Sequence, residues 1–417
     1  MVLQICQGFI QARVRERVPL ASYVHCKPHN LNLAIVHACK EPLVRNLMDT
    51  VQAIAFAFDY SAKRLTSFKE NLGTAPNVVK EEMGRRQKLK TLCETRWASR
   101  SDSLFTFLHA YSVVCDSLED LEQDGDAKAR SYRCSITKFD FIVGLVVAQA
   151  ILQPLAPLSA ILQTKDFDLI QAVEESKVVV EMLQRKRETD DDWDQLYNSA
   201  VTLADSVDVV PSMPRGATRQ QHRVNVPAAG PKDYWKRALF IPFIDHLLQE
   251  LRDRLIKNED RFVVQYLILS KLENCSLQVV DRLFNTFTED LPSDRDTFNI
   301  EVERWKARWS IAEGQIPGTL AEILNLCNVD LYPNIYTCLL ILLTIPVTTA
   351  TAERSFSVMR RVKTYLRSTM TTDRLSGPCI LHAYKETPID IDKVIDCFAT
   401  KKDRRLAFLF KATGERE

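Results

Sequence analysis

The sequence lacks the marks of several protein classes. It has only 11 glycines in 417 residues, too few for the many tight turns of a large β-sheet protein. It also lacks an excess of either charge: 55 basic and 54 acidic residues give a net charge of +1. No overall field therefore draws the chain to nucleic acid, and such binding needs a local basic face. With 46% hydrophobic and 26% charged residues, the composition predicts a mainly α globular protein.

Long apolar runs and enzyme signatures are missing as well. The run 338–347 is far shorter than the roughly 20 residues of a membrane helix and is interpreted as a core segment. No hydrophobic signal region follows Met1, and 11 scattered cysteines favour a reducing compartment over disulfides. Neither a Gly-rich phosphate loop nor a G-x-S-x-G elbow occurs. We expect no membrane and no small-molecule substrate.

The length and the apolar periodicity predict several helical units. A chain of 417 residues exceeds what one core usually holds, so two or three packed units are expected. Apolar residues recur at helical spacing through 30–58, 137–186 and 234–288. The segment 209–231, rich in proline and polar residues, predicts a long exposed loop between two helical units. A short strand is expected only at 20–26.

The first motif is Cys26-Lys-Pro-His29, followed by Asn30-Leu-Asn-Leu33. A cysteine and a histidine at this spacing can begin a zinc site. Zinc needs four ligands, however, and no second C-x-x-C or H-x₃₋₅-H pair stands at a suitable distance. The alternative is a buried cysteine beside a hydrogen-bonded histidine, and the motif alone leaves both interpretations open.

The second motif is Glu94-Thr-Arg96-Trp97. An aromatic ring next to a guanidinium group can stack on an unpaired base while the arginine holds a phosphate. The alternative is a packed tryptophan beside a solvated arginine. We predict Arg96 and Trp97 as nucleic-acid contacts.

The third motif, 348–384, predicts an amphipathic and basic helix. Its apolar stripe has spacings of three, three and four, from Phe356, Met359, Val362 and Leu366. The remaining surface carries basic residues, among them Arg360, Arg361, Lys363 and Arg367. This face predicts weak, salt-sensitive DNA binding without sequence preference, and its alternative is an ordinary solvated face. Glu353 stands near the helix start, where the helix dipole favours a carboxylate.

In their order, the strings HCKPHNLNL, CETRW and ATAERSFSVMRRVKTYLRSTM followed by RLSG resemble the hAT transposase superfamily. The string RVNVPAAGPKDYWKRALFIPFIDHLLQEL is also similar to a linking segment of its members. The resemblance covers roughly residues 8–386 and extends to a group of cellular and element-encoded members that includes the zinc-finger MYM-type proteins. The ordered set of motifs is far more specific than any one of them.

The resemblance implies a truncated RNase H-like α/β remnant interrupted by a large all-α insertion. Residues 1–100 are expected to form the partial RNase H-like remnant, and 101–318 the helical insertion. Residues 319–386 are expected to form the C-terminal dimerisation region with the last RNase H-like helix. A C-terminal tail, 387–417, follows.

The resemblance also implies three carboxylates that hold two metal ions for DNA hydrolysis and strand transfer. The last of them maps to Glu353. The two aspartates lie upstream of the Cys26 motif in the family, and residues 1–25 contain none. We therefore expect a non-catalytic derivative without a cofactor. The alternative is a fragment of an active, Mg²⁺-dependent transposase whose aspartates and zinc finger are encoded upstream.

Self-association is the activity that the sequence predicts best. The apolar run around Leu339, Leu340 and Leu343 is too continuous for a surface helix, so either the chain's own core or a partner covers it. With Phe356 and Met359 these residues are the predicted dimerisation contacts. We expect a homodimer that binds DNA weakly, located in the nucleus or otherwise in the cytoplasm.

Overall fold

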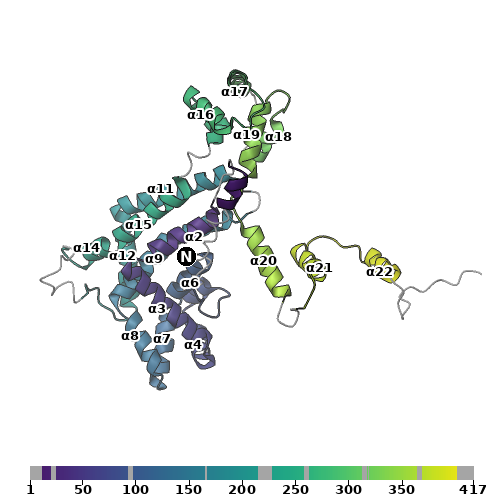
Figure 1. Cartoon of the computed structure of the whole chain (residues 1–417). Coiled ribbons are helices and arrows are strands. Elements are labelled where there is room, and N and C mark those ends of the chain that lie inside the picture. The colour runs from purple at the N-terminus through teal and green to yellow at the C-terminus, as the bar shows by residue number, and fades with distance from the viewer. Residues whose placement is uncertain are drawn as a thin grey trace, which may run out of the picture. The chain divides into compact units, whose positions relative to one another are not determined.

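Figure 1 shows the computed structural model of the chain. It describes residues 12–19, 25–92, 97–164, 167–214, 228–257, 263–311, 317, 319–363 and 369–401. Every regular element in these ranges is a helix, which confirms the mainly α prediction. Of the predicted strand, His25 and Cys26 are irregular and 20–24 lie outside the described residues. The RNase H-like remnant stays a prediction.

The chain divides into two units, residues Met1–Thr348 and Thr349–Glu417, called unit 1 and unit 2 below. The predicted boundaries at 100, 318 and 386 are neither supported nor contradicted by this division. The expected dimerisation region, 319–386, contributes residues to both units. Part of the expected tail, 387–417, is helical.

Besides the helical segment 12–17, the first part of unit 1 contains eleven helices within the described residues. They are α2 (Lys27–Ala38), α3 (Pro42–Asp59), α4 (Ala62–Thr74), α5 (Asn77–Met83), α6 (Trp97–His109), α7 (Tyr111–Gln123), α8 (Ala127–Ile136), α9 (Phe139–Leu152), α10 (Leu155–Ile161), α11 (Leu169–Glu188) and α12 (Asp190–Asp205). At the start of several of these helices, a capping side chain accepts a hydrogen bond from a backbone N–H group. Ser61 caps α4, Asp126 caps α8, and Asp168 forms a capping box on α11.

The second part of unit 1 follows the predicted loop, whose residues 215–227 lie outside the described ranges. Its helices are α14 (Pro231–Trp235), η1 (Lys236–Phe240), α15 (Ile241–Leu251), η2 (Arg252–Ile256), η4 (Val263–Leu267), η5 (Leu269–Asn274), α16 (Leu277–Phe287), α17 (Arg295–Ser310), α18 (Leu320–Leu326) and α19 (Pro333–Thr344). α15 packs against α2 and α11, which lie far away in sequence.

The core of unit 1 is built around α9. This helix is apolar on all sides, and nearly all of its residues are buried against α3, α6 and α12. The stretch Phe139–Ile161 is long and apolar enough to cross a membrane by composition, yet 67% of its apolar window is buried inside the unit. Burial of that kind is typical of a core helix. This stretch, and not the run 338–347, is the one whose length and composition approach those of a membrane helix.

Unit 2 contains α20 (Ala350–Val362), α21 (Thr372–Ala383) and α22 (Ile391–Thr400). α20 and α21 pack against each other. None of the unit 2 residues whose side chains are described is buried. Three short helices thus present their apolar side chains to solvent.

Candidate dimerisation surface and family motifs

The third motif, 348–384, contains α20 and α21, and α20 is the helix that the periodicity of Phe356 and Met359 predicts. α20 begins at Ala350, so Glu353 lies in its first turn at the backbone level, although its side chain is outside the described residues. Of the predicted apolar stripe, Phe356 is 66% exposed and Met359 39% exposed. Leu366 lies outside the described residues. The exposed side of α20 therefore carries an aromatic ring and a methionine with no core around them.

The apolar surface continues on α21. Ile380 and Leu381 are exposed there, and Tyr384 is exposed directly after the helix. Exposed apolar groups of this number, gathered on short helices, typically mark contact with another protein. We call the exposed apolar residues of α20 and α21 the apolar surface of unit 2: Phe356, Met359, Ile380, Leu381 and Tyr384.

The predicted basic face is present at the end of α20. Arg360, Arg361 and Lys363 are all exposed. They stand in the last turn and directly after it, where the helix dipole favours cations. Arg367 lies outside the described residues. The structure thus leaves three adjacent cations accessible to an anionic partner.

α19 divides the predicted dimerisation leucines between core and surface. Leu339 is fully buried in unit 1, so it contributes to the unit's own core and offers no surface to a partner. Leu340 and Leu343 are 41% and 39% exposed and stay candidates. The chain's own core therefore covers Leu339, and what covers Leu340 and Leu343 stays open.

A buried carboxylate that sequence reasoning missed orients α19. Glu301 on α17 is 4% exposed, and its two oxygens accept the Asn334 Nδ2 amide at 2.6 Å and the Ile335 backbone N–H at 2.7 Å. These donors belong to the first turn of α19, whose N–H groups have no partner within the helix. Glu301 thereby fixes the start of the helix that exposes Leu340 and Leu343. In the sequence, Glu301 looks like any acidic residue of a solvated helix.

Two residues of the first motif that the sequence did not single out make long-range contacts. Cys26 is half-buried at the start of α2 and His29 is exposed. Lys27, which is buried, donates from Nζ to the Leu255 carbonyl at 2.8 Å, and Asn30 donates to the Arg254 carbonyl at 3.1 Å. Both carbonyls lie at the end of η2, where the helix leaves them without a partner.

The same motif also holds the end of unit 1. The Lys27 backbone N–H donates to the Val347 carbonyl at 2.9 Å. Lys27 therefore connects α2 both to η2 and to the residues just before the unit boundary at Thr348. A single sequence gives no signal for this, because a lysine at a helix start is usually exposed.

Within the described part of the chain, no group of three or more His, Cys, Asp or Glu side chains is arranged to hold a metal ion. Several thiols are also poor ligands. Burial raises the pKa of both Cys115 and Cys338 to about 12, and that of Cys327 to about 11. A thiol binds metal as the thiolate, so these cysteines are interpreted as core residues.

The second motif lies at the start of α6. Trp97 is the first residue of that helix, but its side chain and the whole of Arg96 lie outside the described residues. The predicted contact with an unpaired base stays a prediction.

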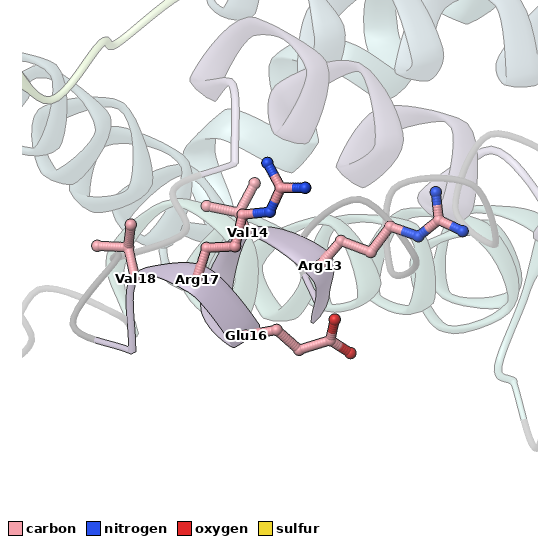
Figure 2. A pocket seen from close by; sticks show the side chains of 5 residues that line it. All are labelled: Arg13, Val14, Glu16, Arg17 and Val18. Carbon is pink, nitrogen blue, oxygen red and sulfur yellow. The ribbon is translucent and has the colours of Figure 1, made fainter.

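An open hollow lies beside the first described residues of the chain. It is lined by Arg13, Val14, Glu16, Arg17 and Val18, as Figure 2 shows. All five side chains are exposed and come from consecutive turns of one short segment. A hollow without a buried polar group lacks the converging donors of a small-molecule site.

The comparison with known proteins agrees with the motifs. Residues 313–386 match the hAT family C-terminal dimerisation region. The chain therefore carries this region, and the resemblance to the hAT superfamily is confirmed.

At the level of individual proteins, the chain is similar to the 52 kDa repressor of the inhibitor of the protein kinase. It is 26% identical to the Homo sapiens protein over 410 residues, which are 93% of this chain and 52% of that protein. The Mus musculus protein is 26% identical over 412 residues, covering 93% and 53%. The chain thus spans about half the length of these relatives. The sequence motifs also indicate this repressor, together with the zinc-finger MYM-type proteins.

Proposed function

We propose that this polypeptide is a non-catalytic, transposase-derived protein that acts by forming a homodimer through unit 2. The observation that carries the proposal is the apolar surface of unit 2, which is exposed within a segment that matches a dimerisation region. Burying such side chains against a second copy removes apolar area from water, at roughly 25 cal/mol per Å². Dimerisation also needs no residue beyond those present.

Sedimentation equilibrium of the chain between about 1 and 100 µM tests the proposal, over the range of ordinary homodimer affinities. Phe356→Asp places a charge in the apolar surface of unit 2 and is expected to raise the dimer dissociation constant at least about tenfold. Val78→Asp is the matched control, because Val78 is an exposed apolar residue of unit 1. A wild-type chain that remains monomeric throughout this range contradicts the proposal.

The non-catalytic part of the proposal concerns this polypeptide alone. Of the three carboxylates that the resemblance implies, only Glu353 has a counterpart in its sequence, and one carboxylate does not hold two metal ions in line. We expect no cleavage of supercoiled DNA by the purified chain with Mg²⁺ or Mn²⁺. Cleavage that disappears in Glu353→Gln contradicts this and favours the alternative, a fragment of an active transposase.

A second candidate function is weak binding of DNA by the basic end of α20. Exposed Arg360, Arg361 and Lys363 supply a local positive face in a chain of net charge +1. Each phosphate contact adds close to one unit to the salt dependence of binding. This role places the protein in the nucleus, which microscopy of a tagged chain tests.

The DNA proposal is tested by fluorescence anisotropy at low salt. Arg360→Glu combined with Arg361→Glu is expected to lower the affinity at least about tenfold and to flatten the salt dependence. The control is Arg130→Glu with Arg185→Glu, which changes the charge equally at two arginines of unit 1 whose side chains are 75% and 76% exposed. Equal affinities of the two double variants contradict the proposal.

A further inference from the structure

The contact between α2 and η2, called the α2–η2 junction below, joins segments more than 200 residues apart in sequence. α2 packs against both α15 and η2 (Figure 1). η2 is a short π-helix, in which the Lys257 backbone N–H donates to the Arg252 carbonyl at 2.8 Å. Lys27 and Asn30 donate to carbonyls at its end, and Lys27 also donates to Val347. The junction therefore fixes both η2 and the end of unit 1.

The α2–η2 junction contains a histidine that lies between two opposite charges. Nδ1 of His37, on α2, is 3.2 Å from Nη2 of Arg254 and 3.5 Å from Oε1 of Glu250. A guanidinium group only donates hydrogen bonds, and an ionised carboxylate only accepts them. Nδ1 therefore accepts from Arg254 when it carries no proton and donates to Glu250 when it carries one. The protonation of a single ring nitrogen decides which of the two partners it binds.

The surroundings of His37 favour the neutral ring. Burial lowers the pKa of His37, and the positive charges of Lys40 and Arg254 lower it further, whereas Glu250 acts in the opposite direction. Glu250 is also shared with other groups. Its Oε2 accepts from Arg254 Nε at 2.5 Å, and its Oε1 lies 3.9 Å from His246 Nε2. The carboxylate therefore offsets only part of the cost of charging His37.

His246, on α15, responds to acid differently. Its Nδ1 lies 3.0 Å from Oε1 of Glu41, the residue before α3. A ring Nδ1–H donates to this carboxylate in the neutral and in the charged form alike, so acid leaves the contact in place. Of these two histidines, His37 is the one that loses a partner when it is protonated.

We propose that His37 makes the α2–η2 junction sensitive to pH. In the neutral state its ring accepts from Arg254 and helps to hold η2 against α2. In acid the charged ring repels Arg254, donates to Glu250 instead, and loosens η2. Because Lys27 binds both η2 and Val347, the loosening extends to the residues just before the unit boundary. The inference does not depend on the proposed dimerisation, since all these groups belong to unit 1.

The pH dependence of the junction has a definite sign. The pKa of His37 is lower in the closed junction than in an open or unfolded chain, so the closed junction binds fewer protons. The stabilisation from His37 is fully present above the ordinary histidine pKa of about 6.5. It is lost as the pH falls through the lower folded value. Within this window, one proton changes the ratio of closed to open junction by at most about tenfold per pH unit.

The pKa of His37 is measured directly by NMR of the full chain with ¹³C-labelled histidine, and His37→Gln identifies its signal. We expect a pKa below about 6.5 in the wild type and a higher pKa in Arg254→Gln, which removes the opposing charge and the donor. Lys40→Gln, at an exposed position, changes no contact of the junction described above and is expected to raise the pKa as well. A wild-type pKa that is not below about 6.5, or that neither variant raises, overturns the proposal.

Hydrogen exchange measured by mass spectrometry at about pH 7.5 and about pH 5.5 tests the loosening. After correction for the intrinsic pH dependence of exchange, peptides from α2 and η2 are expected to exchange at least about twofold faster in acid. His37→Gln keeps an amide oxygen that accepts from Arg254 but does not titrate, so this increase should be absent. His29→Gln is the matched control, because His29 is an exposed histidine on the same helix.

The outcomes distinguish a pH-sensitive contact from a histidine that only packs. Faster exchange in acid in the wild type and in His29→Gln, but not in His37→Gln, supports the proposal. If His37→Gln speeds up exchange equally at both pH values, the ring is only a packing group and the proposal is overturned. If wild type and His37→Gln respond to pH alike, or if acid speeds up exchange uniformly over unit 1, the proposal is overturned as well.

Discussion

The two units carry the same sequence pattern with opposite structural results. In α3 of unit 1, Leu47, Val51 and Ile54 recur at helical spacing and are buried. In α22 of unit 2, Ile391 and Val394 follow the same spacing and are exposed. The periodicity of apolar residues therefore predicts that a helix has an apolar face, but it does not predict what covers that face.

The difference follows from the neighbours that each unit provides. Unit 1 has α9, a helix apolar on all sides that several others surround. The described part of unit 2 has three helices of 13, 12 and 10 residues, and so short a set rarely builds a core alone. Its described apolar side chains stay exposed to solvent, whereas many of those in unit 1 pack against the chain itself.

The largest effect is expected from removing a core tryptophan of unit 1. Trp305 is fully buried, and its indole N–H donates to the Leu267 carbonyl at 3.0 Å. Trp305→Ala is expected to lower the free energy of unfolding by about 4 kcal/mol. Phe356→Ala, an aromatic truncation in unit 2, is expected to change it by less than about 0.5 kcal/mol at concentrations where the chain is monomeric.

Urea unfolding followed by far-UV circular dichroism measures this contrast, because helices of both units contribute to the signal. If Trp305→Ala and Phe356→Ala lowered the free energy of unfolding equally, the distinction between a unit with a core and a unit without one would be wrong.

A smaller effect is expected where unit 1 buries a charge. Glu301→Ala leaves the Asn334 amide and the Ile335 N–H without their acceptor at the start of α19, at a cost of about 3 kcal/mol. Glu303→Ala is the control two residues away, since Glu303 is exposed. Thermal unfolding of the two variants measures the difference, and equal midpoints would mean that the carboxylate does not fix α19.

Two ion pairs of unit 1 allow a partly buried charge to be compared with an exposed one. Hydrogen bonds from Arg64 hold the pKa of Asp126 below its ordinary value, and the Arg64 Nε donor lies 2.9 Å from Asp126 Oδ2. Asp126→Asn keeps the cap of α8 but loses the charge, and is expected to cost about 1.5 kcal/mol at pH 7. Asp124→Asn, in an ion pair with Lys63 that is about 60% exposed on both sides, is the control and is expected to cost under about 0.5 kcal/mol.

The pH dependence of this effect has a definite sign. Because the pKa of Asp126 is lower in the folded than in the unfolded chain, its stabilisation is fully present above the ordinary aspartate pKa of about 3.9. It disappears as the pH falls through the lower folded value. Unfolding free energies of wild type and Asp126→Asn should therefore converge below about pH 4, and a constant difference would exclude the ion pair as its source.

The smallest expected difference between the two units is in the reactivity of their cysteine thiols, and it does not involve the free energy of unfolding. Cys397 in unit 2 is exposed, whereas Cys338 in unit 1 is buried and its pKa is raised to about 12 by burial. A thiol reagent at pH 8 should label Cys397 in the native chain and Cys338 only after unfolding. Mass spectrometry of the labelled peptides measures both, and rapid native labelling of Cys338 would show that α19 is not packed as described.

Sequence reasoning was sound for local features and weaker for tertiary ones. It predicted a helix at Phe356 and Met359 and left open whether Leu339 is covered by the core. It predicted helix through 137–186 but not that α9 is the centre of the unit 1 core, because the helices that surround a segment are set by tertiary contacts. It did not find the contacts of Lys27 and Asn30, since the burial of a lysine depends on carbonyls more than 200 residues away.

The sequence by itself determined the helical class, the caps, the apolar stripe of α20 and the resemblance to hAT proteins. These depend on neighbours a few positions apart or on ordered motifs. Only the tertiary structure decided that Leu339 is core, that Glu301 orients α19, and that no described residue of unit 2 is buried. Burial depends on the neighbouring elements, so apolar residues at the same helical spacing form a core in one unit and an exposed surface in the other.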